Sequence, residues 1–170
     1  PVSIVRPAAI YGPGDMRLLK LFRLAKKRVF PLFGKGEGLY HLIHVEDLTD
    51  IFITAAFHPA ALGEVFIAGN PEASSLEQIA RTVSAELGGR RVRFLRLPAW
   101  PLFLAADICE LLCKPFGLSP PLYRRRVAFF TKDRAFDTSK LRSRLGYRYS
   151  FDVESGLRST TRWYREAGLL

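Results

Sequence analysis

Short apolar runs alternate with amphipathic stretches through the first half of the chain, and this alternation limits the fold more than any other feature. The run at 65–68 is apolar at every position and is bounded by Gly63 and Gly69. Another run, at 2–5, ends at Arg6-Pro7. Residues 18–25 instead repeat their apolar side chains at helical spacing. Continuous apolar runs are typical of strands inside parallel sheets, so the alternation predicts an α/β unit.

The second half of the chain is mostly helical by the same criteria. Ser74 or Ser75 can form a capping box with the Glu-Gln pair that follows, and the helix that they start ends at the glycine pair 88–89. Asp152 is the expected cap of the last helix. In the first half, Pro31 is expected to end the helix that contains residues 18–25. We therefore expect a parallel α/β unit beside a smaller, mostly helical lobe.

Basic residues outnumber acidic ones, 26 Lys and Arg against 16 Asp and Glu, for a net charge of +10. They form short clusters at 26–28, 90–91 and 124–126, but no zinc-finger, RNA-binding or basic-zipper pattern accompanies them. We therefore expect no nucleic-acid partner. A solvated basic face, or attraction to anionic lipid or to a phosphorylated cofactor, explains the charge as well.

The two cysteines, Cys109 and Cys113, are four residues apart in an apolar stretch. A disulfide framework or a zinc site needs more ligands or other spacings. We expect two buried thiols on one helix face, no metal site, and a reducing, cytoplasmic compartment. The surrounding segment, 98–113, is the most apolar of the chain, but it is too short to span a bilayer and contains Asp107 and Glu110.

Four motifs occur in a fixed order along the chain. Arg6-Pro7 is followed by Tyr-Gly-Pro-Gly-Asp at 11–15, by His-Val-Glu-Asp-Leu at 44–48, and by an end pattern between 137 and 168. Together they resemble the C-terminal half of the extended short-chain dehydrogenases/reductases, the NAD-dependent epimerase/dehydratase family. The resemblance covers essentially all of residues 1–170 and implies that the chain is the C-terminal part of a longer protein.

The resemblance also implies how the chain is divided. Residues 1–70 would be the C-terminal part of a Rossmann-type parallel sheet that binds NAD(P), with an excursion toward the substrate at 12–45. Residues 71–170 would be a smaller, mostly helical lobe that binds the substrate. The cofactor of the longer protein would be NAD or NADP, and family members often form homodimers.

The catalytic features of that family do not occur in this sequence. Its members have a glycine-rich phosphate turn and catalyse with a tyrosine and a lysine four residues apart. Here no tyrosine is followed four residues later by lysine, and no glycine cluster lies between a strand and a helix N-terminus. We therefore assign no catalytic residue and expect this chain to be inactive alone. Whether the longer protein is an active enzyme stays open.

The resemblance assigns the backbone at Pro7 and Ala8 to the nicotinamide of the cofactor, since a rigid proline and small neighbours suit a close approach to a flat ring. The alternative is that Pro7 only ends a strand. Ala9 and Tyr11, in the same motif, are assigned to the substrate. Ala9 stands where sugar-nucleotide members often keep an asparagine, and an alanine side chain cannot form hydrogen bonds.

The segment before the second expected helix departs from the sugar-nucleotide pattern as well. Tyr40 and His41 stand in place of Arg-Asp, which removes an arginine suited to binding phosphate. His41 either faces the substrate cleft or is a packed or surface histidine. We expect His44 to be packed and Asp47 to cap the second helix.

Residues 98–117 and 119–126 occupy the part of the family that varies with the substrate. Trp100 and the apolar residues after it either wall an apolar cleft, lie on a membrane with the arginines at 124–126, or form ordinary core. This lobe resembles the 3β-hydroxysteroid dehydrogenase branch and the related flavonoid and isoprenoid reductases.

The resemblance and its two departures favour one function over two alternatives. We expect an NAD(P)-dependent oxidoreductase that acts on a secondary alcohol or ketone of an apolar small molecule, sterol-like or isoprenoid-like. A nucleotide-sugar epimerase or dehydratase of the same family is one alternative, and a binding member without catalysis is the other. Peripheral contact with a membrane is a separate expectation.

Overall fold

The computed structural model describes residues 1–34, 38–89, 92–124, 127 and 133–170. Its strands are β1 (Ile4–Pro7), β2 (Ala9–Tyr11), β3 (Val29–Phe33), β4 (Leu39–Tyr40), β5 (Leu42–His44), β6 (Val65–Ala68), β7 (Ser74–Ser75) and β8 (Arg93–Leu97). Its helices are α1 (Leu19–Ala25), α2 (Val45–Phe57), α3 (Leu76–Glu86), α4 (Trp100–Cys113), α6 (Ser139–Leu145) and α7 (Val153–Glu166), with 3₁₀ turns η1 (Pro59–Ala61) and η2 (Lys114–Phe116).

Most of the strand pairing in the described ranges is parallel. β1 pairs with β6, β2 with β5 and β3 with β8, whereas β4 and β7 form an antiparallel pair. At least one helix lies between the two partners of every parallel pair, as the crossover between parallel strands requires. The prediction of an α/β fold with parallel strands is therefore confirmed.

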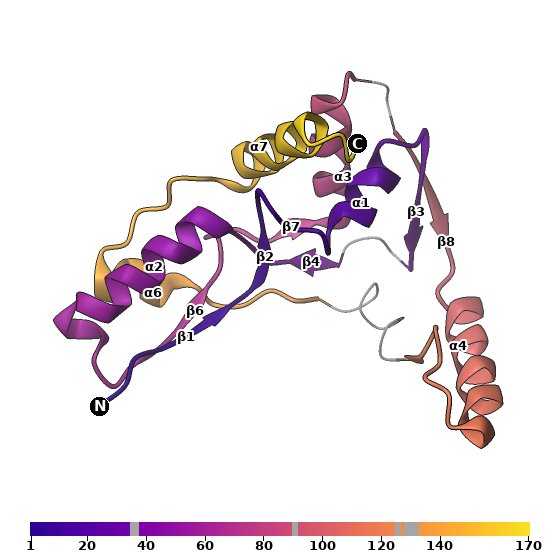
Figure 1. The fold of residues 1–170 in the computed structure, drawn as a ribbon, viewed down its shortest axis with the longest axis horizontal. Coiled ribbons are helices and arrows are strands. Elements are labelled where there is room, and N and C mark those ends of the chain that lie inside the picture. Colours follow the sequence, from indigo (N-terminus) through magenta and orange to yellow (C-terminus); the bar gives the residue numbers. More distant parts are fainter. Residues whose placement is uncertain (35–37, 90–91, 125–126, 128–132) are drawn as a thin grey trace.

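β1 and β2 are consecutive parts of one extended stretch that changes its partner (Figure 1). The N–H of Ala8 donates to the carbonyl of Ala68 at 2.8 Å, which continues the pairing with β6. The N–H of Ala9 donates to the carbonyl of His41 at 3.1 Å, directly before β5. The change of partner therefore falls between Ala8 and Ala9.

Two clusters of buried side chains stabilise this arrangement. The first lies among α1, β3, α3 and α7 and includes Phe22 and Tyr164, whose rings meet edge to face. The second lies among α2, β6 and α6 and includes Phe66 and Leu141. Each fully buried side chain of this size contributes about 1.5–3 kcal/mol. The two groups of helices lie at different ends of the β1–β2 stretch (Figure 1).

Two expectations about element boundaries have different outcomes. The capping box of α3 is confirmed, because Ser75 Oγ accepts from the N–H of Gln78 at 3.1 Å and Gln78 Oε1 accepts from the N–H of Ser75 at 2.8 Å. The expectation that Pro31 ends α1 is wrong. α1 ends at Ala25, and Pro31 lies inside β3 opposite Leu95. A strand with a neighbour on one side only tolerates the missing N–H of proline.

α4 extends away from the other helices and carries few buried side chains (Figure 1). Its only buried residue is Ala106. Cys109 and Cys113 are free and partly exposed, so the expectation that both thiols are buried is wrong, because α4 has few neighbours to cover them. Along the described chain, no helix combines the length and the apolar composition needed to cross a membrane.

Candidate functional site

The carboxyl end of β1 is the first feature of the candidate site. Pro7 is the last residue of β1 and is exposed, and Ala8 after it is half-buried. A Cβ on Gly69, which follows β6, would lie 3.3 Å from the Cβ of Ala8 and 3.0 Å from Cγ2 of Thr138. Ligands of parallel α/β proteins bind beyond the carboxyl ends of strands, where neighbouring strands diverge. β1 meets this condition at Pro7 and Ala8, because the chain changes partner there.

An apolar cavity of about 440 Å³ opens beside Ala9. Strand residues Ala9, Tyr40 and Leu42 form one wall of this cavity. The other walls come from α1, α3 and α7 and from the residues before α1. Their lining residues are Arg17, Leu18, Lys20, Leu21, Phe22, Leu24, Leu76, Ile79 and Leu157. Arg17 and Lys20 are the charged members of this set, and both are exposed.

Strand register explains why Tyr40 reaches the cavity and His41 does not. Ala9 pairs with Leu42 across β2 and β5, so these two residues lie beside one another. Successive side chains of an extended chain point to opposite faces, which gives Tyr40 the same face as Leu42. Tyr40 is 5% exposed, and burial raises the pKa of its hydroxyl. His41, between them, does not line the cavity.

His41 instead binds the segment that precedes α6. Its Nδ1 accepts from the N–H of Phe136 at 2.7 Å, and the two rings are stacked. The backbone of Arg134 holds the same two segments together. Its N–H donates to the carbonyl of Leu39, and its carbonyl accepts from the N–H of His41. Nε2 of His41 has no hydrogen-bond partner among the described residues. Burial lowers the pKa of this imidazole. His41 is a packed histidine, one of the alternatives that its sequence context left open.

Tyr11 and His44 are both completely buried. Their rings meet edge to face at 5.4 Å, and Phe151 stacks on His44 at 3.9 Å. α7 approaches so closely that a Cβ on Gly156 would lie 2.9 Å from Cζ of Tyr11. The Tyr11 hydroxyl has no hydrogen-bond partner in the described ranges, and burial raises its pKa. His44 is therefore packed as predicted, and Tyr11 packs against α7 rather than lining the apolar cavity.

Asp47 does not cap α2, and that prediction is wrong. α2 begins at Val45, and its N-cap residue, His44, makes no side-chain cap hydrogen bond. The buried Asp47 carboxylate accepts from the Tyr147 hydroxyl at 3.0 Å, from the N–H of Ser150 at 2.8 Å and from the N–H of Phe151 at 3.2 Å. These donors all come from the chain between α6 and α7. Asp47 thus ties that connection to α2.

Trp100 is separated from the other predicted site residues. It begins α4, is 67% exposed, and does not line the apolar cavity. Of the six residues assigned from sequence, the structure brings Ala9 to this cavity and places Pro7 and Ala8 directly before it. Sequence reasoning missed Arg17, Lys20 and Tyr40 as lining residues. The alternation around Leu42 was a signal for Tyr40, but the partner of β5 was not known from sequence.

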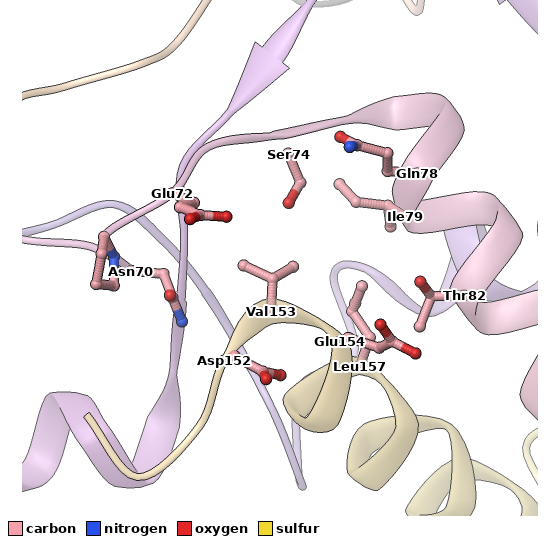
Figure 2. A pocket seen from close by; sticks show the side chains of 11 residues that line it. Asn70, Glu72, Ser74, Gln78, Ile79, Thr82, Asp152, Val153, Glu154 and Leu157 are labelled. Carbon is pink, nitrogen blue, oxygen red and sulfur yellow. The ribbon is translucent and has the colours of Figure 1, made fainter.

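A second cavity, of about 500 Å³ and polar, adjoins the first, because Ile79 and Leu157 line both. Figure 2 shows the carboxylates of Glu72, Asp152 and Glu154 beside Ser74, Gln78 and Asn70 around this space. Asp152 Oδ1 accepts from the N–H of Ser155 at 2.7 Å, so this carboxylate caps α7 as predicted. In the part of the chain that the structure describes, no group of His, Cys, Asp and Glu could hold a metal ion.

No family model matches the sequence. Curated relatives do. The 3β-hydroxysteroid dehydrogenase/decarboxylase isoform 2 of Arabidopsis thaliana is 29% identical over 171 residues, covering 92% of the chain and 30% of that protein. The ceramide reductase of Caulobacter vibrioides is 30% identical, and the match covers 98% of the chain and 52% of that reductase. The UDP-glucose 4-epimerase of Vibrio cholerae is 26% identical, and the match covers 98% of the chain and 47% of that epimerase. The chain spans about a third to a half of these relatives.

Solved structures share the fold. The crystal structure of gox2253 matches 98% of the chain and 50% of its own with a TM-score of 0.74 and 24% identity. The dTDP-glucose 4,6-dehydratase of Bacillus anthracis, in complex with NAD, matches 100% of the chain and 48% of its own with a TM-score of 0.64 and 18% identity. The α/β arrangement of β1 to α7 is therefore also found in larger, related folds.

Proposed function

We propose that residues 1–170 form the substrate-binding side of an NAD(P)-dependent oxidoreductase. The chain belongs to the NAD-dependent epimerase/dehydratase family of extended short-chain dehydrogenases/reductases. The substrate of this oxidoreductase is a secondary alcohol or ketone on an apolar, sterol-like or isoprenoid-like skeleton. Residues 1–70 supply the end of the cofactor-binding sheet and, with Ala9 and the excursion at 12–45, most of the lining of the apolar cavity, and residues 71–170 supply the smaller lobe and the rest of that lining.

The apolar cavity beside Ala9 carries this proposal. Its volume of about 440 Å³ lies within the range of roughly 300–1,000 Å³ that small-molecule sites occupy. Apart from Arg17, Lys20 and the Tyr40 hydroxyl, its lining side chains are hydrocarbon. Such a lining favours a ligand that gains free energy by leaving water, and it offers few partners to the hydroxyl groups of a sugar.

Pro7 and Ala8 fit the nicotinamide end of NAD(P). Pro7 is exposed and its neighbour Ala8 has a small side chain, which supports the approach of a flat ring to the backbone where β1 ends. Two of the structural neighbours, the dehydratase above and the UDP-glucuronic acid 4-epimerase of Bacillus cereus, are complexes with NAD. When bound, the nicotinamide would exchange a hydride with the substrate carbon. The residues of this chain would position the ring and exclude water from the cavity.

A nucleotide-sugar substrate is the second candidate. The UDP-glucose 4-epimerase of Vibrio cholerae matches nearly the whole chain, and Arg17 and Lys20 could pair with a diphosphate at the rim of the cavity. Arg17 is already paired with Asp15, at 3.3 Å, and Ala9 provides no hydrogen bond to a sugar. These two features favour the apolar substrate.

Isothermal titration separates the two candidates. The protein is titrated with a sterol alcohol, an isoprenoid alcohol, UDP-glucose and dTDP-glucose. We expect an apolar alcohol to bind and Ala9→Leu to weaken that binding about tenfold, because the larger side chain occupies the cavity. Ala60→Leu, on the exposed η1 turn, is the matched control and should bind as the unaltered protein does. Binding of a nucleotide sugar alone, lost in Arg17→Ala, would instead establish the second candidate.

A further inference from the structure

α4 exposes a continuous apolar face. Its five large exposed apolar side chains, between 49% and 71% exposed, are Trp100, Leu104, Ile108, Leu111 and Leu112. At 100° per residue, these positions fall within about a third of the helix circumference. Pro101, which is also exposed, lies in the same sector, and Ala105 lies just outside it. This sector therefore contains no charged residue, and we call it the α4 apolar face.

Asp107 lies just outside this face and Glu110 lies farther round the helix, and both carboxylates have a partner. Arg124 Nη1 donates to Asp107 Oδ2 at 2.5 Å, and the N–H of Arg124 donates to Glu110 Oε1 at 2.6 Å. The guanidinium also lies 5.4 Å from the centre of the Phe103 ring. The chain after η2 thus folds back onto the side of α4 that carries the two acids. It leaves the apolar face uncovered by any described residue.

Charge complementarity points to the occupant of this face. The charges on or against α4 balance one another, since Asp107 and Glu110 are matched by Lys114 and Arg124, so the sign of the attraction is set by the rest of the chain. The whole chain has a net charge of +10, so two copies of it repel one another, whereas an anionic surface attracts it. The Arg125 and Arg126 of the sequence cluster lie outside the described residues.

We propose that the α4 apolar face docks on an anionic lipid surface, with the helix lying in the plane of the headgroups. α4 has 14 residues and is about 21 Å long, which suits a helix parallel to a membrane and is too short for one that crosses it. Trp100, at its first position, suits the boundary between headgroups and acyl chains. α4 extends away from the other helices, so this contact leaves them in water (Figure 1).

Sedimentation with vesicles tests the proposal. The protein is mixed with vesicles of phosphatidylcholine alone or with phosphatidylserine added, at low and at high salt. We expect binding to the mixed vesicles at low salt and weaker binding as salt rises, because salt screens the attraction. The double variant Leu104→Asp/Leu111→Asp should lower the bound fraction about tenfold or more, since both side chains would enter lipid as charges.

The matched control is Phe52→Asp/Phe57→Asp on α2. Both phenylalanines are exposed, and this variant changes the net charge by the same amount. It should bind vesicles as the unaltered protein does. Equal losses in the two variants would show that net charge alone binds the vesicles, and this would overturn the proposal. No sedimentation at low salt would overturn it too, as would a stable dimer that Leu104→Asp/Leu111→Asp dissociates.

A second measurement does not use the aspartate variants. Trp163→Phe leaves Trp100 as the only indole of the chain. Its emission should shift to shorter wavelength when phosphatidylserine vesicles are added, because the indole leaves water. An unchanged emission with vesicles that do sediment the protein would place the contact elsewhere and contradict the proposal. The α4 apolar face is separate from the apolar cavity, so neither result bears on the proposed substrate.

Discussion

At the scale of single residues, buried polar side chains decide how the parts of the chain are held together. Asp47 and His41 each bind backbone N–H groups that are about 95 to 104 residues away in sequence. Asp47 holds the connection between α6 and α7, and His41 holds the segment before α6. Both contacts join the second half of the chain to the segment around β5. Each residue therefore makes a long-range hydrogen bond that joins distant parts of the chain.

Removal of the Asp47 carboxylate should destabilise the fold. Asp47→Ala leaves the buried N–H groups of Ser150 and Phe151 without their acceptor, and the Tyr147 hydroxyl keeps only the backbone carbonyl of residue 47. We expect the free energy of unfolding to fall by about 3 kcal/mol, measured by urea denaturation. Asp50→Ala, an exposed position on the same helix, is the control and should change it little. Equal effects of the two substitutions would show that Asp47 matters only through its charge.

The two buried histidines should make stability depend on pH. Burial lowers the pKa of both His41 and His44, and Glu46 and Asp47 oppose this effect only in part at His44. The unfolded chain therefore takes up protons at higher pH than the folded chain does. The stabilisation of the folded state by its neutral histidines is therefore complete above the ordinary histidine pKa of about 6.5, and it is lost as the pH falls below that value.

Denaturation curves between pH 5 and 8 measure this dependence. The double variant His41→Asn/His44→Phe should show a smaller loss of stability at low pH, because asparagine still accepts the Phe136 N–H and neither side chain takes up a proton. An unaltered slope would assign the pH dependence to the carboxylates instead.

At the scale of elements, local signals predicted the helices better than the strand neighbours. Ser75 and Asp152 cap α3 and α7 as expected, because a cap depends on residues three positions apart. Asp47 has an equally good capping pattern, but donors about a hundred residues away bind it instead. Pro31 can lie in a strand because, among the described residues, β8 alone pairs with that strand. No local pattern contains either piece of information.

The cap of α3 offers a test at this scale. Ser75→Ala removes the acceptor of the Gln78 N–H and should lower the free energy of unfolding by about 1 kcal/mol. Ser75→Gly should cost only a few tenths of a kcal/mol, because glycine leaves the helix end open to water. Thermal unfolding measures both. A loss that is as large in the glycine variant would point to packing of the Ser75 side chain rather than to its hydrogen bond.

At the scale of the whole molecule, the sequence predicted the family and the α/β class but only part of the candidate site. A motif marks the end of β1, where Pro7, Ala8 and Ala9 lie, and their roles toward cofactor and substrate stay predictions. Tyr40, Arg17 and Lys20 were missed, since they join Ala9 only when β2 pairs with β5 and the α1 segment lines the same cavity. Trp100 was assigned from its apolar surroundings, and apolar surroundings describe an exposed helix face equally well.

A prediction about catalysis also concerns the whole molecule. The sequence has no tyrosine followed four residues later by lysine, so the chain lacks the acid–base pair that its family uses. We expect residues 1–170 to show no NAD(P)-dependent oxidation of secondary alcohols, followed by absorbance of the reduced nicotinamide. A polypeptide that also carries the glycine-rich turn and the tyrosine–lysine pair serves as the positive control. Turnover by residues 1–170 alone would contradict the prediction.

The change of partner between Ala8 and Ala9 has a consequence for how the molecule opens. The N–H of Ala8 is held by the strand of the second core, and the N–H of Ala9 by the segment that leads into β5. Two neighbouring amides thus belong to different hydrogen-bonded structures. Deuterium exchange at these two positions would report two separate opening reactions, and the ratio of their rates would measure how far the two parts of the protein unfold independently.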